Sequence, residues 1–138
     1  MVEAVIKTHK LHDVTHFGIR VAVGIIFMIH STGKFNPQFQ GFFTSIGLPA
    51  EMQIPIALAE LVGGILLVTG VLTRITSSVL AIDMLGAIFL VKKLKTFSGQ
   101  GGWEFELLIL VILLVIIVIG PGRVSISHIA KKIPRFLQ

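Results

Sequence analysis

Four long apolar runs dominate this sequence and constrain its fold more than any other feature. They cover residues 14–30, 54–72, 75–91 and 106–119. With their flanks, these runs give segments of about 17–20 residues, which is long enough for a helix to cross the hydrocarbon core of a bilayer. The 138 residues are 54% hydrophobic and 14% charged, whereas soluble domains carry about 25% charged residues. We therefore expect a single all-α membrane domain over residues 1–138.

The expected architecture is an up-down four-helix bundle with spans at about 14–33, 52–72, 75–92 and 103–120. Short connections between consecutive spans make neighbouring helices antiparallel. Apolar residues at helical spacing predict a short interfacial helix between the first and second spans: Phe35, Phe39, Phe42, Phe43 and Ile46. Residues 123–137 mix basic and apolar side chains at helical spacing, which predicts an amphipathic tail on the membrane surface.

The distribution of basic residues predicts the orientation of the chain in the cell membrane. Four spans place both termini and the turn between spans two and three on one side. Seven basic residues lie on that side: Lys7, Lys10, Arg74, Arg123, Lys131, Lys132 and Arg135. Four lie on the other side: Lys34, Lys92, Lys93 and Lys95. Basic residues are enriched in cytoplasmic loops, so we expect a multi-pass protein with both termini in the cytoplasm.

Several ionisable residues interrupt the spans or sit at their ends, and one group of them predicts a polar pocket. A charge at the centre of a bilayer costs about 2.5–3.5 kcal/mol even on the lenient insertion scale. With a rise of about 1.5 Å per residue, these side chains reach similar heights near the outer leaflet: His30, Lys34, Glu60, Glu104 and Glu106. Such a pocket could exchange protons with a quinol or gate a small solute. Alternatively, its groups could only hydrogen-bond helices together.

Arg20 and Asp83 form a second candidate pair, near the inner leaflet. The same rise per residue places them at heights that a long arginine side chain could bridge. Intramembrane charges generally pair with one another, so we expect an ion pair that fixes the helix register. The alternative is that the two residues form one station of a proton path.

The remaining composition bears on cofactors and partners. The chain has no cysteine, which excludes disulfides, iron–sulfur clusters and thiolate-ligated haem. His30 is the only histidine deep within a span, whereas a bis-histidine haem needs two. His9, His12 and His16 have a spacing compatible with a helical metal site, but such sets are more often solvated, and we expect no metal. The basic ends favour lipid headgroups over nucleic acid as partners.

Five short motifs, in order, resemble those of the DoxX family. They are Arg20-x3-Gly24-x2-Phe27-x2-His30-x3-Lys34-Phe35, Ala59-Glu60-x2-Gly63-Gly64, Gly70-x2-Thr73-Arg74, Asp83-Met84, and Gly101-Gly102-x-Glu104 followed by Gly120-Pro121-Gly122-x2-Ser125. The resemblance implies a four-helix membrane protein with a redox-linked role. Two positions depart from the family pattern. Ser31 replaces the usual glycine after the histidine, and Lys92 replaces a histidine often found near the end of the third helix.

These observations together predict a small membrane subunit of a redox-linked, quinone- or quinol-associated complex, acting as an accessory or quinone-binding subunit. We expect a noncovalently bound quinone as the ligand, and no catalysis by this chain alone; no catalytic residue is assigned. The expected partners are the lipid bilayer and either other subunits or a second copy. Two alternatives remain at this stage: a non-catalytic anchor or assembly subunit of a larger enzyme, and a carrier of small solutes or protons.

Overall fold

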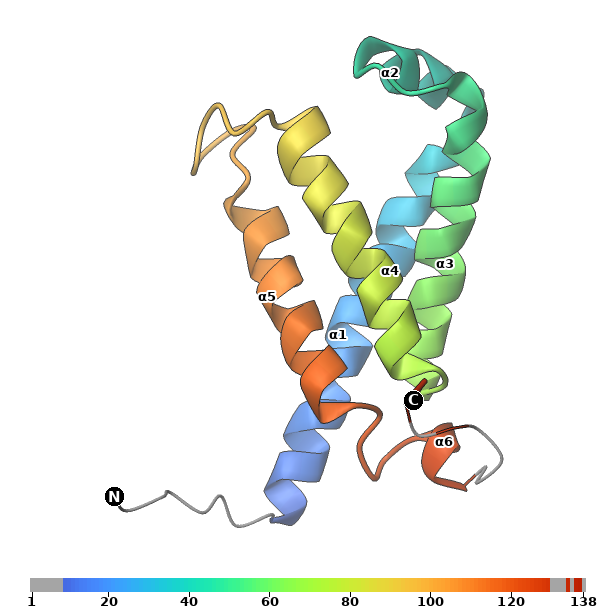
Figure 1. Ribbon diagram of the computed structural model, residues 1–138, viewed down its shortest axis with the longest axis vertical. Helices are drawn as coiled ribbons and strands as arrows, with labels where there is room; N and C mark the ends of the chain where they lie inside the picture. Colours follow the sequence, from blue (N-terminus) through green and yellow to red (C-terminus); the bar gives the residue numbers. More distant parts are fainter. Residues whose placement is uncertain (1–8, 130–133, 135, 138) are drawn as a thin grey trace.

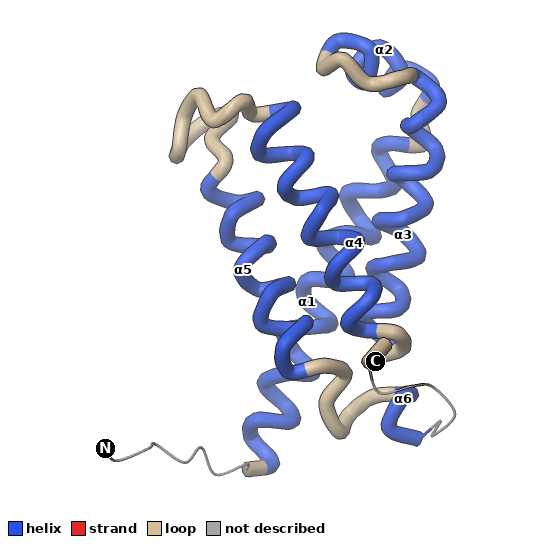
Figure 2. The backbone as a smooth tube through the Cα atoms, in the orientation of Figure 1, coloured by secondary structure: helices blue, strands red, loops and turns tan. Residues whose placement is uncertain are grey.

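A computed structural model describes residues 9–129, 134, 136 and 137, and every regular element in this part of the chain is helical (Figures 1 and 2). The α-helices are α1 Lys10–Lys34, α2 Gln40–Ser45, α3 Gln53–Thr69, α4 Thr73–Gly86, α5 Glu104–Ile119 and α6 Ile126–Ile129. Two 3-10 turns, η1 Pro37–Phe39 and η2 Ala50–Met52, precede α2 and α3, and the π-helical segment η3 Ala87–Val91 continues α4. The expected all-α class is therefore confirmed for the described residues.

Three segments are long and apolar enough to cross a membrane: Lys10–Lys34, Ala50–Thr69 and Thr73–Val91. The fourth long helix, α5, has 16 residues. The first helix begins at Lys10 and not near residue 14 as expected. Hydrophobicity marks the part of a helix that suits lipid, and it does not mark where the helix begins. Asp13 in the first turn favours this earlier start, because a negative charge stabilises a helix N-terminus.

Consecutive long helices alternate in direction and form two pairs, α1 with α3 and α4 with α5 (Figure 1). Contacts between α3 and α4 join the pairs, and α1 and α5 meet only sparsely. The pairs diverge toward the end that carries α2 (Figure 1). One hydrophobic core connects all four long helices and includes Phe27, Leu67, Leu80 and Leu113. The divergence above this core leaves room for the pocket described below.

Two glycines bring α1 and α3 into close contact. A Cβ atom on Gly24 would lie 2.6 Å from the carbonyl oxygen of Gly64, and a Cβ on Gly64 would lie 2.6 Å from that of Gly24. Small residues at helix crossings allow this close backbone approach. The crossing fixes which face of α1 meets α3, and so fixes which side chains can meet above and below it.

Two further predictions concern the connecting segments. The helical segment expected between the first two spans is present as η1 and α2, and it ends before Gly47, which has a φ of 84°. In the predicted tail, only Ile126–Ile129 is an α-helix among the described residues. The prediction also covers residues 130–133 and 135, which lie outside the described part of the chain.

Candidate functional site

A cavity of about 470 Å³ lies between the two helix pairs at the end of the molecule that carries α2. Its walls are mostly apolar and come from α1 to α5 and their connections. Five ionisable residues interrupt these walls: His30, Lys34, Glu60, Asp83 and Glu106. Ligand pockets in proteins typically have volumes of about 300–1,000 Å³ and combine apolar walls with a few polar groups. The cavity therefore has the size and lining of a small-molecule site.

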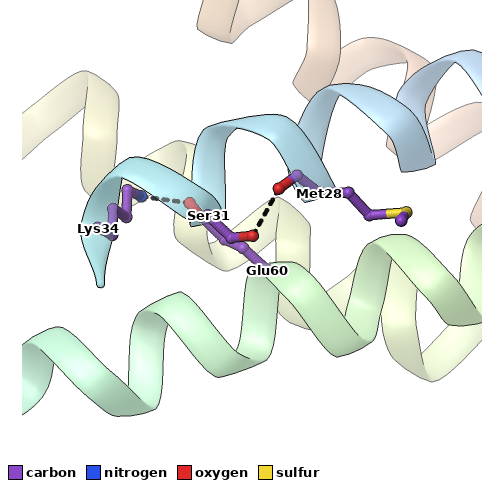
Figure 3. Close-up of polar contacts among 4 residues, drawn as sticks. All are labelled: Met28, Ser31, Lys34 and Glu60. Carbon is purple, nitrogen blue, oxygen red and sulfur yellow. Dashed lines mark hydrogen bonds and ion pairs between the residues drawn. The ribbon is translucent and has the colours of Figure 1, made fainter. Parts of the chain in front are cut away.

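Glu60 is the most deeply buried acid of this pocket, with 1% of its surface exposed. Its Oε1 accepts a hydrogen bond from the ammonium group of Lys34, the last residue of α1 (Figure 3). Its Oε2 is also buried and has no hydrogen-bond partner among the described residues. A buried oxygen without a donor is costly. Glu60 thus lines the cavity and has one carboxyl oxygen without a hydrogen bond.

Gln53 holds the start of α3 against the end of α1 and so sets the position of this ion pair. Its side-chain amide donates to the carbonyl oxygens of Lys34 and Asn36, the second at 2.7 Å. Only 2% of Gln53 is exposed. Sequence reasoning did not single out this residue; the available signal was an amide at the start of a mostly apolar helix.

Ser31 lies in the same turn of α1 and is fully buried. Its hydroxyl donates to the carbonyl oxygen of Met28 at 2.7 Å, within its own helix (Figure 3). A serine whose hydroxyl donates to a carbonyl of the preceding turn has already used its one side-chain donor. This departure from the family pattern therefore adds no donor to the pocket.

The α4 and α5 helices contribute the opposite wall. Asp83 lines the cavity, and its carboxyl group lies within interaction range of Glu60. Glu106 forms an ion pair with Lys92, with 3.6 Å between Oε1 and Nζ, while its Oε2 is buried and has no partner among the described residues. Lys92, the second departure from the family pattern, thus pairs with an acid in the first turn of α5. His30 stacks on Phe105 with 6.0 Å between ring centroids.

The structure brings four of the five predicted pocket residues to this cavity and leaves Glu104 outside it. Glu104 is exposed and accepts a hydrogen bond from the backbone N–H of Gly99 at 3.3 Å. Residues two positions apart on an α-helix point in directions about 200° apart. Glu104 and Glu106 therefore cannot face the same pocket. Asp83, which the sequence analysis pairs with Arg20, lines this cavity.

The expected ion pair between Arg20 and Asp83 is corrected by the structure. Arg20 has no exposed surface, and it donates to the carbonyl oxygen of Leu67 at 2.9 Å and to that of Val124. Leu67 lies in the last turn of α3, where carbonyls lack a helical donor. Asp83 lies ten residues beyond the start of α4, Thr73, which is about 15 Å along the axis. Arg20 instead lies beside Gly70, at the level of the turn between α3 and α4. The first helix extends below that level to Lys10 (Figure 1), so a height counted from the inner end of each helix does not compare the two residues.

The three N-terminal histidines do not form one group. His9 and His12 are exposed at the start of α1, where the backbone N–H of His9 donates to Nδ1 of His12 at 3.1 Å. His16 is buried and lies against Gly122. Within the described residues, no group of three or more histidine, cysteine or acidic side chains is placed to hold a metal ion.

The family of the chain follows from comparison with known sequences. The family model named DoxX matches residues 16–93, more than half of the chain. The chain belongs to the DoxX family. The matched region of this DoxX protein contains His30, Lys34, Glu60 and Asp83, and it ends before Glu106. The pocket wall contributed by α1, α3 and α4 therefore lies in the family region.

Three relatives match most of this DoxX protein. It is 41% identical over 107 residues to "Putative oxidoreductase CatD" of Bacillus subtilis, covering 75% of this chain and 79% of the relative. It is 33% identical over 126 residues to an uncharacterized membrane protein of Mycobacterium tuberculosis, covering 80% and 77%. A protein of unknown function from Haemophilus influenzae is 28% identical over 117 residues, covering 80% and 86%. No solved structure matches.

Proposed function

We propose that this DoxX protein is a small membrane subunit of a redox-linked complex and that its pocket binds a quinone or quinol. The observation that carries the proposal is the buried, unpartnered Oε2 of Glu60 beside a largely apolar cavity of about 470 Å³. A quinol hydroxyl could donate a hydrogen bond to this oxygen. The Lys34 ammonium could donate to a quinone carbonyl, and Phe105 offers an aromatic face to the ring.

The redox link has separate support. The Bacillus subtilis relative carries the word oxidoreductase in its name, and the family resemblance implies the same type of role. In this proposal a partner subunit exchanges electrons with the quinone, and the present chain binds and orients it. In the same proposal, Glu60 and Asp83, which both line the cavity, exchange protons with the head group.

The proposal includes an arrangement in the membrane. The 16 residues of α5 extend about 24 Å, and Trp103 precedes them at a position suited to the headgroup level. We place α5 as the fourth antiparallel span of the bundle and α2 in the membrane interface. With both termini in the cytoplasm, as the basic residues favour, the pocket lies toward the outer leaflet of the cell membrane.

Binding of a quinone analogue to the purified protein in lipid nanodiscs tests the proposal. We expect saturable binding to the native chain and at least ten-fold weaker binding to Glu60→Gln, because the glutamine amide places a donor where an acceptor is needed. Glu51→Gln is the matched control, since Glu51 is exposed at the same end of the molecule. The absence of binding at a saturating analogue concentration would overturn the quinone proposal.

The subunit role needs its own experiment. Extraction in a mild detergent, followed by affinity purification of this chain, is expected to recover a stoichiometric enzyme partner. Recovery of such a partner without any quinone binding would favour the anchoring role instead. A monodisperse preparation without a partner would contradict both subunit roles.

A further inference from the structure

The pocket wall between α3 and α4 is apolar and partly exposed. On α3 and the turn before it, Met52 and Ile56 line the cavity. On α4, Val79 and Ile82 line it as well, and Ile82 is 69% exposed. A side chain that borders a cavity and is also mostly exposed lies at an opening. The cavity therefore opens to the outside between α3 and α4. The side chains of Met52, Ile56, Val79 and Ile82 form an apolar strip along this opening.

Gly86 widens this opening. It lines the cavity, and a Cβ atom built on it would have no heavy atom within 4 Å outside its own helix and chain neighbours. Its backbone has ordinary helical angles, with a φ of −57°, so no backbone strain requires glycine at this position. The space next to Gly86 is free to hold a ligand atom.

An aromatic cluster covers the end of the pocket near α2. The rings of Phe39 and Phe42 lie 4.9 Å apart between centroids, and both contact Phe43, which is 2% exposed. All three residues line the cavity. Such a cluster resists the entry of a polar solute along the axis of the molecule, whereas the strip between α3 and α4 is suited to hydrocarbon.

We infer that the ligand enters the pocket sideways from the bilayer, between α3 and α4, and that it carries a long isoprenoid or alkyl tail that stays on this strip. The polar head then reaches Glu60 and Lys34, and the tail lies along Ile56, Val79 and Ile82 past Gly86. The identity of the head group as a quinone rests on the proposed function. The lateral opening and the tail rest on the apolar strip alone.

The first test compares two analogues with the same benzoquinone head, with and without a decyl tail, in nanodiscs. Every other ring position of the head is substituted, so that the quinone does not add to a thiol. Affinities are expressed relative to the concentration of each analogue in the lipid, so that partitioning does not mimic binding. We expect the native chain to bind the tailed analogue at least ten-fold more tightly. Gly86→Phe should remove this preference by filling the opening. Gly18→Phe is the control, because Gly18 also has open space around it but lies in α1 away from the pocket.

The second test does not depend on Gly86→Phe folding correctly. Since the chain has no cysteine, an Ile82→Cys variant carries a single thiol at the opening. Its alkylation by a membrane-permeant maleimide should slow at least five-fold with the tailed quinone and with 4-decylphenol, a donor head with no quinone chemistry. The tail-less head should have little effect. Val118→Cys is the control, on the exposed face of α5.

The outcomes separate the two proposals. Protection by 4-decylphenol without any quinone binding supports the lateral opening and overturns the quinone function. Equal affinity for both quinone analogues, with no protection of the Ile82→Cys thiol, overturns the lateral opening and leaves the quinone function in place. Failure of all three compounds to bind or protect overturns both.

Discussion

Arg20 and Glu60 are both buried, at opposite ends of the molecule, but their hydrogen-bond partners differ. Arg20 lies at the end near α6 and directs its guanidinium to the carbonyls of Leu67 and Val124. Glu60 lies at the end near α2, pairs with Lys34 through one oxygen, and leaves the other unpartnered beside a cavity. A buried charge satisfied by backbone carbonyls acts as a structural clamp. A buried acid that borders a cavity and has an oxygen without a hydrogen bond is a candidate for ligand binding.

The packing around Arg20 is also tighter than the packing around Glu60. A Cβ atom on Gly70 would lie 2.2 Å from Nη1 of Arg20, so the backbone closes directly over the guanidinium. Nε of Arg20 also lacks a partner among the described residues. A second pocket lies at this end, but Val68 and Val124 border it and Arg20 does not. Beside Glu60 and Asp83, Gly86 leaves open space. Tight packing directly around Arg20 and a cavity bordered by Glu60 separate a scaffold residue from a site residue.

The largest expected effect is that of Arg20→Met. The substitution leaves the carbonyls of Leu67 and Val124 without a charged donor, and each such bond contributes about 1.5–3 kcal/mol. We expect the free energy of unfolding to fall by about 4 kcal/mol, measured by denaturation in mixed micelles. Arg123→Met is the control, because Arg123 is exposed and its contact with Asp13 spans 3.9 Å; exposed pairs contribute about 0–1 kcal/mol. Equal stability of the two variants would show that the hydrogen bonds of Arg20 do not stabilise the fold.

Gly70→Ala should have the next largest effect. Gly70 has a φ of 73°, and a methyl group there would collide with the Arg20 guanidinium. Strain of this kind costs about 1–3 kcal/mol, so we expect a loss of about 2–3 kcal/mol in the unfolding free energy. Gly18→Ala, in the open part of α1, should instead be neutral or stabilising by up to about 1 kcal/mol, as alanine favours helices. Similar results for both variants would contradict the tight packing at Gly70.

Lys34→Met should destabilise the protein by about 2 kcal/mol, because it leaves the buried Glu60 carboxyl without its donor. Adding Glu60→Gln in the same chain is expected to recover most of this loss, since a neutral amide is less costly to bury than an unpaired carboxylate. Thermal denaturation of the two single variants and the double variant gives the coupling. Strictly additive effects would show that the pair does not act as a unit.

Asp83→Asn should have the smallest effect on stability, below about 1 kcal/mol, because Asp83 lines the cavity together with Glu60 and forms no ion pair with a described residue. If Asp83 were paired with Arg20, stranding the arginine would cost about 3–5 kcal/mol. The same denaturation measurement therefore distinguishes the two arrangements. A loss of several kcal/mol would restore the ion pair and remove Asp83 from the pocket.

The sequence by itself determined the class of this protein and most of its helices. Mean hydropathy and helical spacing are properties of each segment, so the apolar segments and the short helix after Gly33-Lys34 could be recognised without knowledge of their neighbours. The motifs that resemble the DoxX family were equally local. The rise per residue also gave useful heights, which placed His30 and Glu60 near the same end of the bundle.

Tertiary structure alone decided which side chains meet. Height along a helix does not fix direction around it, and the crossing of α1 and α3 at Gly24 and Gly64 sets that direction. It turns Arg20 toward the last carbonyls of α3 and lets Asp83 approach Glu60 from α4. The opening beside Gly86 depends on how far two helix pairs diverge. No single segment encodes that divergence, because it results from side chains packing between helices that are distant in the sequence.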